Sequence, residues 1–377
     1  MKVHAVWSLV AIAMTCSCPA PPGTEGESEG EGEGEGEGEG EGEGEGEGEG
    51  EGEGEGEGEG EGEGEGEGEG EGEGEGEGEG DGDPFVMPAR ALCSGSLGSA
   101  TTVDFVDGVV AEASGIAPSP TTPGLLWLHA DSGDSARLFA VATDGHVLGE
   151  LRLPGVTAVD LEDLAAAPCP DQLAACLWVA DTGDNGWDSG NARASLAVYA
   201  VQEPAIDVDT SFAPLDDARV WHFPFTAEDG PVNVEAFVVL PDASAMVFYE
   251  KKNDGARILR IDAPFVDGAL VEAQVSSHFD TPGTGSNLRV ATGADLHPSG
   301  TRLLLRTYQA LWQADLSTVA LDDVEAGDFV QVAQPAELQG EAACYDESGT
   351  GVWTVSEQLT VSGITLDNPL HHYGCQP

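Results

Sequence analysis

The sequence predicts an all-β propeller, because one apolar phrase recurs five times between about residue 112 and the C-terminus. Each copy has a short apolar strand, a turn, a second strand, a polar loop and a third strand. Self-similarity at roughly 40 to 50 residues, without a helical period, is typical of propeller blades. The aligned positions of the copies are Ser114, Glu162, Glu235, Thr292 and Glu341, at intervals of 48, 73, 57 and 49 residues.

These intervals accommodate four short strands and loops of variable length. We therefore expect five recognisable four-stranded blades, and the spacing leaves room for a degenerate sixth. A β-sandwich is the alternative, since it also uses many short strands separated by turns. A sandwich does not require its strands to repeat one sequence pattern in register. The repeat therefore favours the propeller.

The N-terminus has the pattern of an export signal. Lys2 precedes an apolar run over 6–14 that is too short to span a bilayer, and small residues follow it. We expect a signal peptide over 1–18, of the lipoprotein type with Cys16 or Cys18 as the lipidated residue. An ordinary cleaved signal peptide is the alternative. The chain is thus predicted to be exported, either secreted or held at the outer membrane or cell surface through a lipid anchor only.

Residues 19–83 are dominated by a Glu-Gly array that contains 28 glutamates. Glycine maximises backbone entropy and the like charges repel, so this segment buries too little apolar area to fold. We expect a disordered, solvated tether, whose array of roughly 58 residues spans at most about 190 Å. Weak cation binding is the alternative role for these carboxylates.

Residues 84–377 form the predicted propeller domain, which is long enough for one large core. Thirty of the 71 acidic residues and one of the 13 basic residues precede it, so the domain itself carries 41 acidic and 12 basic residues. Nucleic acid is therefore a poor partner, because phosphate binding depends on clustered Lys and Arg. Cations, and cationic or neutral ligands, fit this charge better.

Five cysteines follow the tether, and in an exported protein they are first considered as disulfide candidates. Cys169 and Cys176 flank a predicted turn, where a local bridge is plausible. Cys93 and Cys375 lie at the two ends of the domain, where a bridge would lock the blade that closes the ring. Cys344 is then left as a buried free thiol on a predicted inner strand.

Propeller connectivity places the start of each first strand and the end of each second strand at one end of the central channel. Both sets of residues are acidic in this chain. The starts of the first strands carry Glu112, Asp160, Glu162, Asp163, Glu235 and Glu341. The ends of the second strands carry Asp131, Asp134, Asp181, Asp184, Glu250 and Glu357. We expect carboxylates to ring one mouth of the channel.

A duplicated loop is the sharpest local signal at this mouth. Residues 130–135 read Ala-Asp-Ser-Gly-Asp-Ser and residues 180–185 read Ala-Asp-Thr-Gly-Asp-Asn. These loops can be structural turns, because Asp and Asn bond nearby amides and glycine permits a left-handed residue. They can also supply oxygen ligands to Ca²⁺, which takes six to eight of them. Neither loop matches an EF-hand, so such an ion would be shared between blades.

Three glutamates, Glu162, Glu235 and Glu341, occupy the same repeat position in different blades. Carboxylates that converge on a narrow channel repel, and protonation, a nearby cation or a metal relieves them. Internal ion pairs and a metal site are both open interpretations. The candidate metal ligands are Glu162, Glu235, Glu341, Asp163, Asp131 and Asp181. The candidate ligand-binding residues are Asp134, Asp184, Asn185, Glu250, Lys251 and Arg306.

The usual enzyme motifs are missing from the predicted propeller domain. Residues 84–377 contain no Gly-x-Ser-x-Gly, P-loop, Gly-x-Gly-x-x-Gly or zinc-ligand spacing. His129 ends a second strand beside Asp131, where a base, a ligand and a satisfied structural histidine are all consistent with its position.

Several motifs resemble those of a group of secreted bacterial β-propeller lipoproteins with WD40-like architecture. They read E-x-S-G-I-A at 112–117, L-W-x-H-x-D-S-G-D-S at 126–135, D-x-E-D-L-A at 160–165, V-A-D-x-G-D-N at 179–185, R-T-Y at 306–308 and G-E-A at 340–342. More distantly, the domain is similar to calcium-dependent phytase-like propellers. That resemblance implies several Ca²⁺ ions at an acidic mouth, although phytases also present more basic residues.

Two functions follow as hypotheses. The first is a surface-tethered propeller that binds an unknown ligand or surface protein, with Ca²⁺ at the acidic mouth. The second is a metal-dependent, phytase-like or lactonase-like hydrolase, with Glu162, Glu235 and Glu341 as metal ligands and a bound water as nucleophile.

Overall fold

The computed structural model describes residues 83–105, 110, 112–131, 133–206, 208, 213–215, 218–285, 288–337, 339–361, 364–366 and 368–376. The predicted signal peptide over 1–18, the candidate lipidation sites Cys16 and Cys18, and the predicted tether up to residue 82 lie outside these residues. Everything below concerns the part of the chain that is described.

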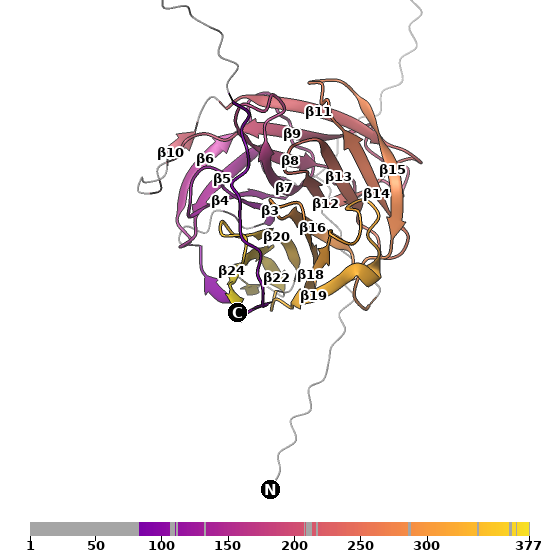
Figure 1. Cartoon of the computed structure of the whole chain (residues 1–377). Helices are drawn as coiled ribbons and strands as arrows, with labels where there is room; N and C mark the ends of the chain where they lie inside the picture. Colours follow the sequence, from indigo (N-terminus) through magenta and orange to yellow (C-terminus); the bar gives the residue numbers. More distant parts are fainter. Residues whose placement is uncertain are drawn as a thin grey trace, which may run out of the picture. The chain divides into compact units, whose positions relative to one another are not determined.

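The fold is an all-β propeller of five four-stranded blades, as the repeat predicts (Figure 1). The first strands of the five blades are β3 (Ala113–Pro118), β7 (Leu161–Pro168), β12 (Val234–Val239), β16 (Ala291–Leu296) and β20 (Gly340–Tyr345). The second strands are β4 (Leu125–Ala130), β8 (Ala175–Asp181), β13 (Ala245–Glu250), β17 (Arg302–Thr307) and β21 (Val352–Ser356). Each pair is antiparallel, so the start of a first strand meets the end of a second strand.

The third strands are β5 (Arg137–Ala142), β9 (Leu196–Gln202), β14 (Ala256–Asp262), β18 (Ala310–Asp315) and β24 (Leu370–Tyr373). The outermost strands are β6 (Val147–Arg152), β11 (Val220–Ala227), β15 (Val271–Phe279), β19 (Phe329–Ala333) and β2 (Thr101–Val103). Two parallel pairings modify the rim: β11 pairs with β15 and joins two blades into one eight-stranded sheet, and β10 (Ala213–Leu215) extends the first blade beside β6.

The five first strands lie side by side around the centre, in the order β3, β7, β12, β16, β20 and back to β3 (Figure 1). A ring of this kind has no open edge at its axis. Because all five run in the same sense, their first residues gather at one end of the channel. We call this end the mouth.

Strand pairing and a disulfide join the two ends of the domain and close the ring. The N-terminal β2 pairs with β24, so one blade contains strands from both ends of the chain. Beside it, β1 (Ser96–Leu97) pairs with β25 (Cys375–Gln376), and a disulfide joins Cys93 to Cys375. Both disulfides expected from the sequence are present.

The segment that precedes β1 crosses the face opposite the mouth, where it runs in front of the ring in Figure 1. Phe85 N donates to Gln172 O in the β7–β8 loop, and Ala91 N donates to Ser348 O in the β20–β21 loop. Arg90 Nη1 donates to Asp346 O at 3.1 Å. Residues 85–91, called the strap below, are thus fixed to the loops of two blades.

Five apolar layers separate the blades and close the core into a ring. Between the first two blades, for example, Trp127 packs with Leu164 and Leu177, and Trp178 packs with Phe237 between the next two. Successive residues of a strand face opposite neighbours, as the two-residue period of a strand requires. The first and second strands are therefore buried on both faces along almost their whole length, whereas outermost strands such as β15 are exposed at several residues. Cys344 is a buried free thiol within one such layer.

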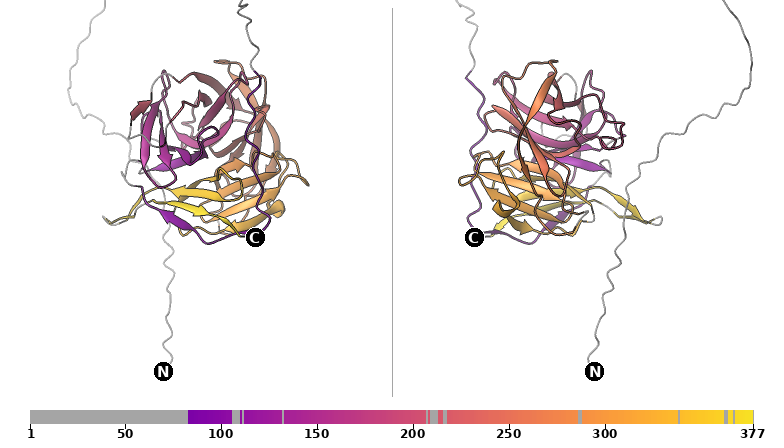
Figure 2. Two further views of the ribbon diagram at one scale, coloured as in Figure 1. Left: turned by 60° about the vertical axis from the view of Figure 1, so that its left-hand side comes forward. Right: turned by 90° about the vertical axis from the view of Figure 1, so that its right-hand side faces the viewer.

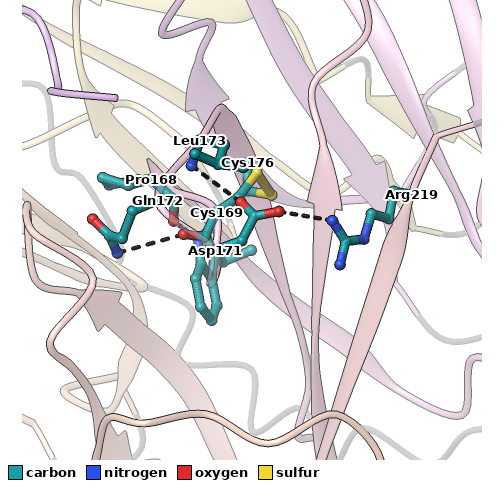
Figure 3. Close-up of a disulfide and its surroundings, with 8 residues drawn as sticks. Pro168, Cys169, Asp171, Gln172, Leu173, Cys176 and Arg219 are labelled. Carbon is teal, nitrogen blue, oxygen red and sulfur yellow. Dashed lines mark hydrogen bonds and ion pairs between the residues drawn. A yellow bond between two sulfur atoms is a disulfide. The ribbon is translucent and has the colours of Figure 1, made fainter. Parts of the chain in front are cut away.

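The second disulfide, Cys169–Cys176, closes the turn between β7 and β8 (Figure 3). Asp171 holds this turn: its carboxylate accepts from Leu173 N at 3.1 Å and from Arg219 Nη1 at 2.7 Å. Gln172 adopts φ 62° within the same turn.

A hairpin of β22 (Leu359–Val361) and β23 (Ile364–Leu366) interrupts the last blade and projects from the ring (Figure 2). The described residues contain a single 3₁₀ turn, Ala326–Asp328, as their helical structure. Within these same ranges no helix has the length and apolar character needed to cross a membrane.

We expect removal of Cys93–Cys375 to destabilise the domain more than removal of Cys169–Cys176. The two bridges span 282 and 7 residues of sequence, and a longer loop restricts the unfolded chain more. Cys93→Ser with Cys375→Ser should cost about 2–5 kcal/mol and lower the unfolding midpoint, as measured by calorimetry. Equal midpoints for the two double variants would contradict this expectation and show that the long bridge adds no more stability than the local one.

Candidate functional site

Each first strand carries a β-bulge at its second residue. In β7, Leu161 pairs with Asp181 and Asp163 pairs with Ala180, so Glu162 has no partner across the ladder. The same omission occurs in the other four first strands. The five bulged residues are Ser114, Glu162, Glu235, Thr292 and Glu341, which are the aligned positions of the sequence repeat. A bulge re-aims a side chain relative to the alternating pattern of its strand.

The two hydroxyl residues in this set link neighbouring blades. Ser114 Oγ donates to Glu162 O at 3.0 Å, and Thr292 Oγ1 donates to Gly340 O at 2.8 Å. The other three bulged residues are glutamates, each 4–5% exposed, and they act on one another electrostatically. Three blades therefore bring a buried carboxylate to the mouth.

A compact group of carboxylates joins the first and second blades at the mouth. Asp131 directly follows β4, Asp160 directly precedes β7, and Glu162 is the β7 bulge. Carboxylate oxygens of these three residues all lie within 4.8 Å of one another. Asp160 and Glu162 are buried and Asp131 is half-buried. This spacing suits shared coordination of one cation.

Gly183 leaves the space that two of these carboxylates fill. A Cβ at this position would lie 2.1 Å from Glu162 Oε1 and 2.4 Å from Asp160 Oδ2. Gly133, its counterpart in the duplicated loop, instead has φ +91° and open surroundings. The two glycines thus have different roles. Gly183 allows two carboxylates to approach the backbone closely, and Gly133 adopts a left-handed backbone conformation.

Lys251 brings the positive charge nearest to the glutamates. Its Nζ pairs with Glu235 Oε1 and lies 5.4 Å from the centre of the Tyr308 ring. Glu235 Oε2 is buried and has no hydrogen-bond partner. The Lys251 ammonium therefore pairs with one oxygen of the Glu235 carboxylate and leaves the other oxygen without a hydrogen bond.

Burial, reinforced by mutual repulsion, makes these carboxyl groups weak acids. It raises the pKa of Asp160 to about 7 and that of Glu357 to about 8. It also raises the pKa of Glu162 and Glu341 well above the usual range, and that of Glu235 although Lys251 opposes the shift. Burial alone would lower the pKa of Lys251, but the surrounding glutamates outweigh it and raise this pKa.

Two predicted metal ligands have their carboxylates occupied by the backbone. Asp181 accepts from Asp160 N at 2.9 Å and from Val159 N at 3.2 Å, and it pairs with Arg193 at 2.8 Å. It therefore positions Asp160. Asp163 Oδ2 accepts from Phe237 N of β12 at 2.9 Å and from Ala294 N of β16 at 3.0 Å. This side chain ties three first strands together at the axis.

The predicted ligand-binding residues are dispersed around the mouth. Asp134 pairs with Arg137 at 2.8 Å, and Glu250 pairs with Arg257 at 3.1 Å. Asp184 accepts from Gly186 N and Arg193 N within its own loop. Asn185 Nδ2 lies 3.5 Å from Asp160 Oδ2, which places it at the edge of the carboxylate group.

Arg306 lies between the last two blades and pairs with Glu337. It is fully buried, and its Nε and Nη1 atoms have no hydrogen-bond partner. Of the two basic residues expected at the mouth, only Lys251 thus contacts a bulged glutamate. His129 is also fully buried, and burial lowers its pKa, so its imidazole is neutral near pH 7.

Several contributors carry weak sequence signals. Asp160 and Glu357 stand among the acidic strand ends, but nothing in the spacing separates them from their neighbours. Glu337 lies outside the repeat phrase, and Tyr308 follows a strand without a polar pattern. Gly183 has the clearest signal, since it belongs to the duplicated loop.

Without a bound cation, we expect stability to fall as pH rises. Asp160 and Glu357 have ordinary pKa values of 3.8 and 4.5, and the fold raises them to about 7 and about 8. The folded state thus binds more protons, and its advantage is complete at low pH and lost as pH passes through 7 and 8. Unfolding midpoints in chelator between pH 5 and 9 test this. Asp160→Asn should flatten the profile, whereas the exposed Asp188→Asn should not.

Gly183→Ala should disrupt the carboxylate group, because its Cβ overlaps Glu162 and Asp160. A loss of about 1–3 kcal/mol in unfolding free energy is expected from such overpacking. The matched control is Gly327→Ala, whose Cβ would meet nothing within 4 Å. Equal stability of the two variants in denaturant titrations would contradict the close approach described here.

The chain matches no known protein-family model and no curated protein. Among solved structures it is similar to XC5397, a gluconolactonase of Xanthomonas campestris, with 15% identity, a TM-score of 0.38 and coverage of 78% of this chain and 95% of that one. It is also similar to the PQQ-bound aldose sugar dehydrogenase of Streptomyces coelicolor, with 14% identity, a TM-score of 0.39 and coverage of 76% and 99%. These likenesses are too distant to transfer an activity, a cofactor or a ligand to this chain.

Proposed function

We propose that this protein is a β-propeller that binds Ca²⁺ at its acidic mouth and uses this mouth to bind a ligand or a protein partner. The observation that carries the proposal is the group of Asp131, Asp160 and Glu162, with oxygens within 4.8 Å of one another. The buried, unpartnered Oε2 of Glu235 supports it independently. A polar atom buried without a partner destabilises the fold, and a cation removes that cost.

The chemistry of the donors favours Ca²⁺ among divalent cations. All three clustered side chains offer hard carboxylate oxygens, which Ca²⁺ and Mg²⁺ prefer over softer metals. The donors come from two blades, and Asp131 and Asp160 lie just outside the strands β4 and β7. Ca²⁺ tolerates such irregular geometry better than Mg²⁺.

A metal-dependent hydrolase remains the second hypothesis from the sequence. It requires, beyond the ion, a metal-bound water and a group that accepts a proton from it. We retain binding as the proposal because the charged groups that act on the cluster are mainly carboxylates that repel one another. A bound cation relieves that repulsion without any reaction. Screening phosphate esters and lactones with the Ca²⁺-loaded chain tests the enzyme hypothesis.

We also propose that the protein is exported and held at a surface by a lipid anchor on Cys16 or Cys18, with the Glu-Gly array as tether. The two disulfides support export, because such bonds persist in oxidising compartments. The acidic domain supports a partner other than nucleic acid. Metabolic labelling with a fatty-acid probe tests the anchor.

Ca²⁺ should raise the unfolding midpoint of the full chain. An ion that binds only the folded state adds about 2.7 kcal/mol at a hundred times its dissociation constant. The matched control is Asp160→Asn with Glu162→Gln, which keeps the acidic N-terminal array and removes the cluster. Thermal unfolding with Ca²⁺, Mg²⁺ and chelator makes the measurement. An equal Ca²⁺ shift in both proteins would overturn the proposed site.

A further inference from the structure

One ammonium group serves three buried glutamates at the mouth. Glu162, Glu235 and Glu341 come from the second, third and fifth blades, and all three act on Lys251 electrostatically. At the equivalent positions of the other blades, Ser114 and Thr292 carry no charge and bond the neighbouring backbone. The three glutamates are therefore distributed around the mouth, with Glu341 separated from the other two by the uncharged first and fourth blades.

Lys251 is held in place from several directions. Its Nζ pairs with Glu235 Oε1, and the Tyr308 ring lies 5.4 Å away. Its backbone N donates to Asn233 O at 2.9 Å, directly beyond the end of β13. The Lys251 side chain is 22% exposed, so it reaches the surface of the mouth while its ammonium pairs with a buried carboxylate.

Glu235 offers carboxylate oxygens to a cation beside the cluster proposed to hold Ca²⁺. It interacts electrostatically with both Asp160 and Glu162 of that cluster. It is 4% exposed and its Oε2 has no hydrogen-bond partner. An ammonium donates to one carboxylate oxygen at a time in this arrangement, whereas a metal ion can take both.

We propose that Lys251 occupies a second cation position beside the Asp131, Asp160 and Glu162 site. The native protein then takes one divalent ion, and the ammonium provides the second positive centre. This inference rests on the proposed function, since it requires the first site to bind an ion. Lys251 thereby limits the mouth to one ion per chain.

Replacing the ammonium should open the second position to a metal. Isothermal titration of the full chain with Ca²⁺ should give one tight site in the native protein. Lys251→Met removes the charge at similar length, and Lys251→Gln also keeps a donor for Glu235. Both variants should bind two ions tightly. The matched control is Lys252→Met, which removes the same charge from an exposed neighbour and should keep one site.

A further variant checks the ligand. Glu235→Gln in the Lys251→Met background should return the stoichiometry to one. Weak sites on the acidic N-terminal array are common to all these proteins and form a shared background.

The outcomes separate the two proposals. No tight site in the native protein would overturn the proposed function. One site in the native protein and one in both Lys251 variants would overturn this inference and leave the function standing. A Lys251 variant that folds only with Ca²⁺ would support the inference, because the ion replaces the missing charge. Failure of both to fold even in Ca²⁺ would contradict it.

Discussion

A buried carboxylate needs donors or a cation, and this requirement organises the centre of the propeller. Asp163 meets it with backbone amides of two other first strands, and Asp295 Oδ2 accepts from Tyr345 N of the next blade at 2.7 Å. These bonds hold the first strands around the axis. The three bulged glutamates meet the need only partly, with Lys251 among them. Buried carboxylates therefore stabilise the ring along the axis, where they accept backbone hydrogen bonds, and destabilise it at the mouth, where they repel one another.

Much of the fold could be predicted from the sequence, because the repeat records the same ladder in each blade. The aligned residues turned out to share a structural cause, the bulge at the second position of each first strand. Closure by both ends of the chain was also predictable from propeller connectivity and the positions of Cys93 and Cys375. The parallel pairing of β11 with β15 was not, since neither strand carries a pattern that distinguishes it from an ordinary rim strand.

The site was less predictable, because adjacent residues differ in their roles. Glu162 and Asp163 are neighbours in sequence, yet the bulge sends one to the mouth and the other into the axis. Asp181 and Asp131 occupy matching positions of the duplicated loop, but Arg193 and two amides engage Asp181. Such differences depend on partners from other blades. The pairing of Arg306 with Glu337 is of the same kind, since Glu337 precedes its strand outside the repeat.

The strap makes the two faces of the propeller different. It is fixed to the loops that join first to second strands, so residue 83 lies on the face opposite the carboxylates. The N-terminal end of the described domain therefore does not cover the carboxylates. A large partner can reach the mouth without displacing the strap or the disulfide that follows it.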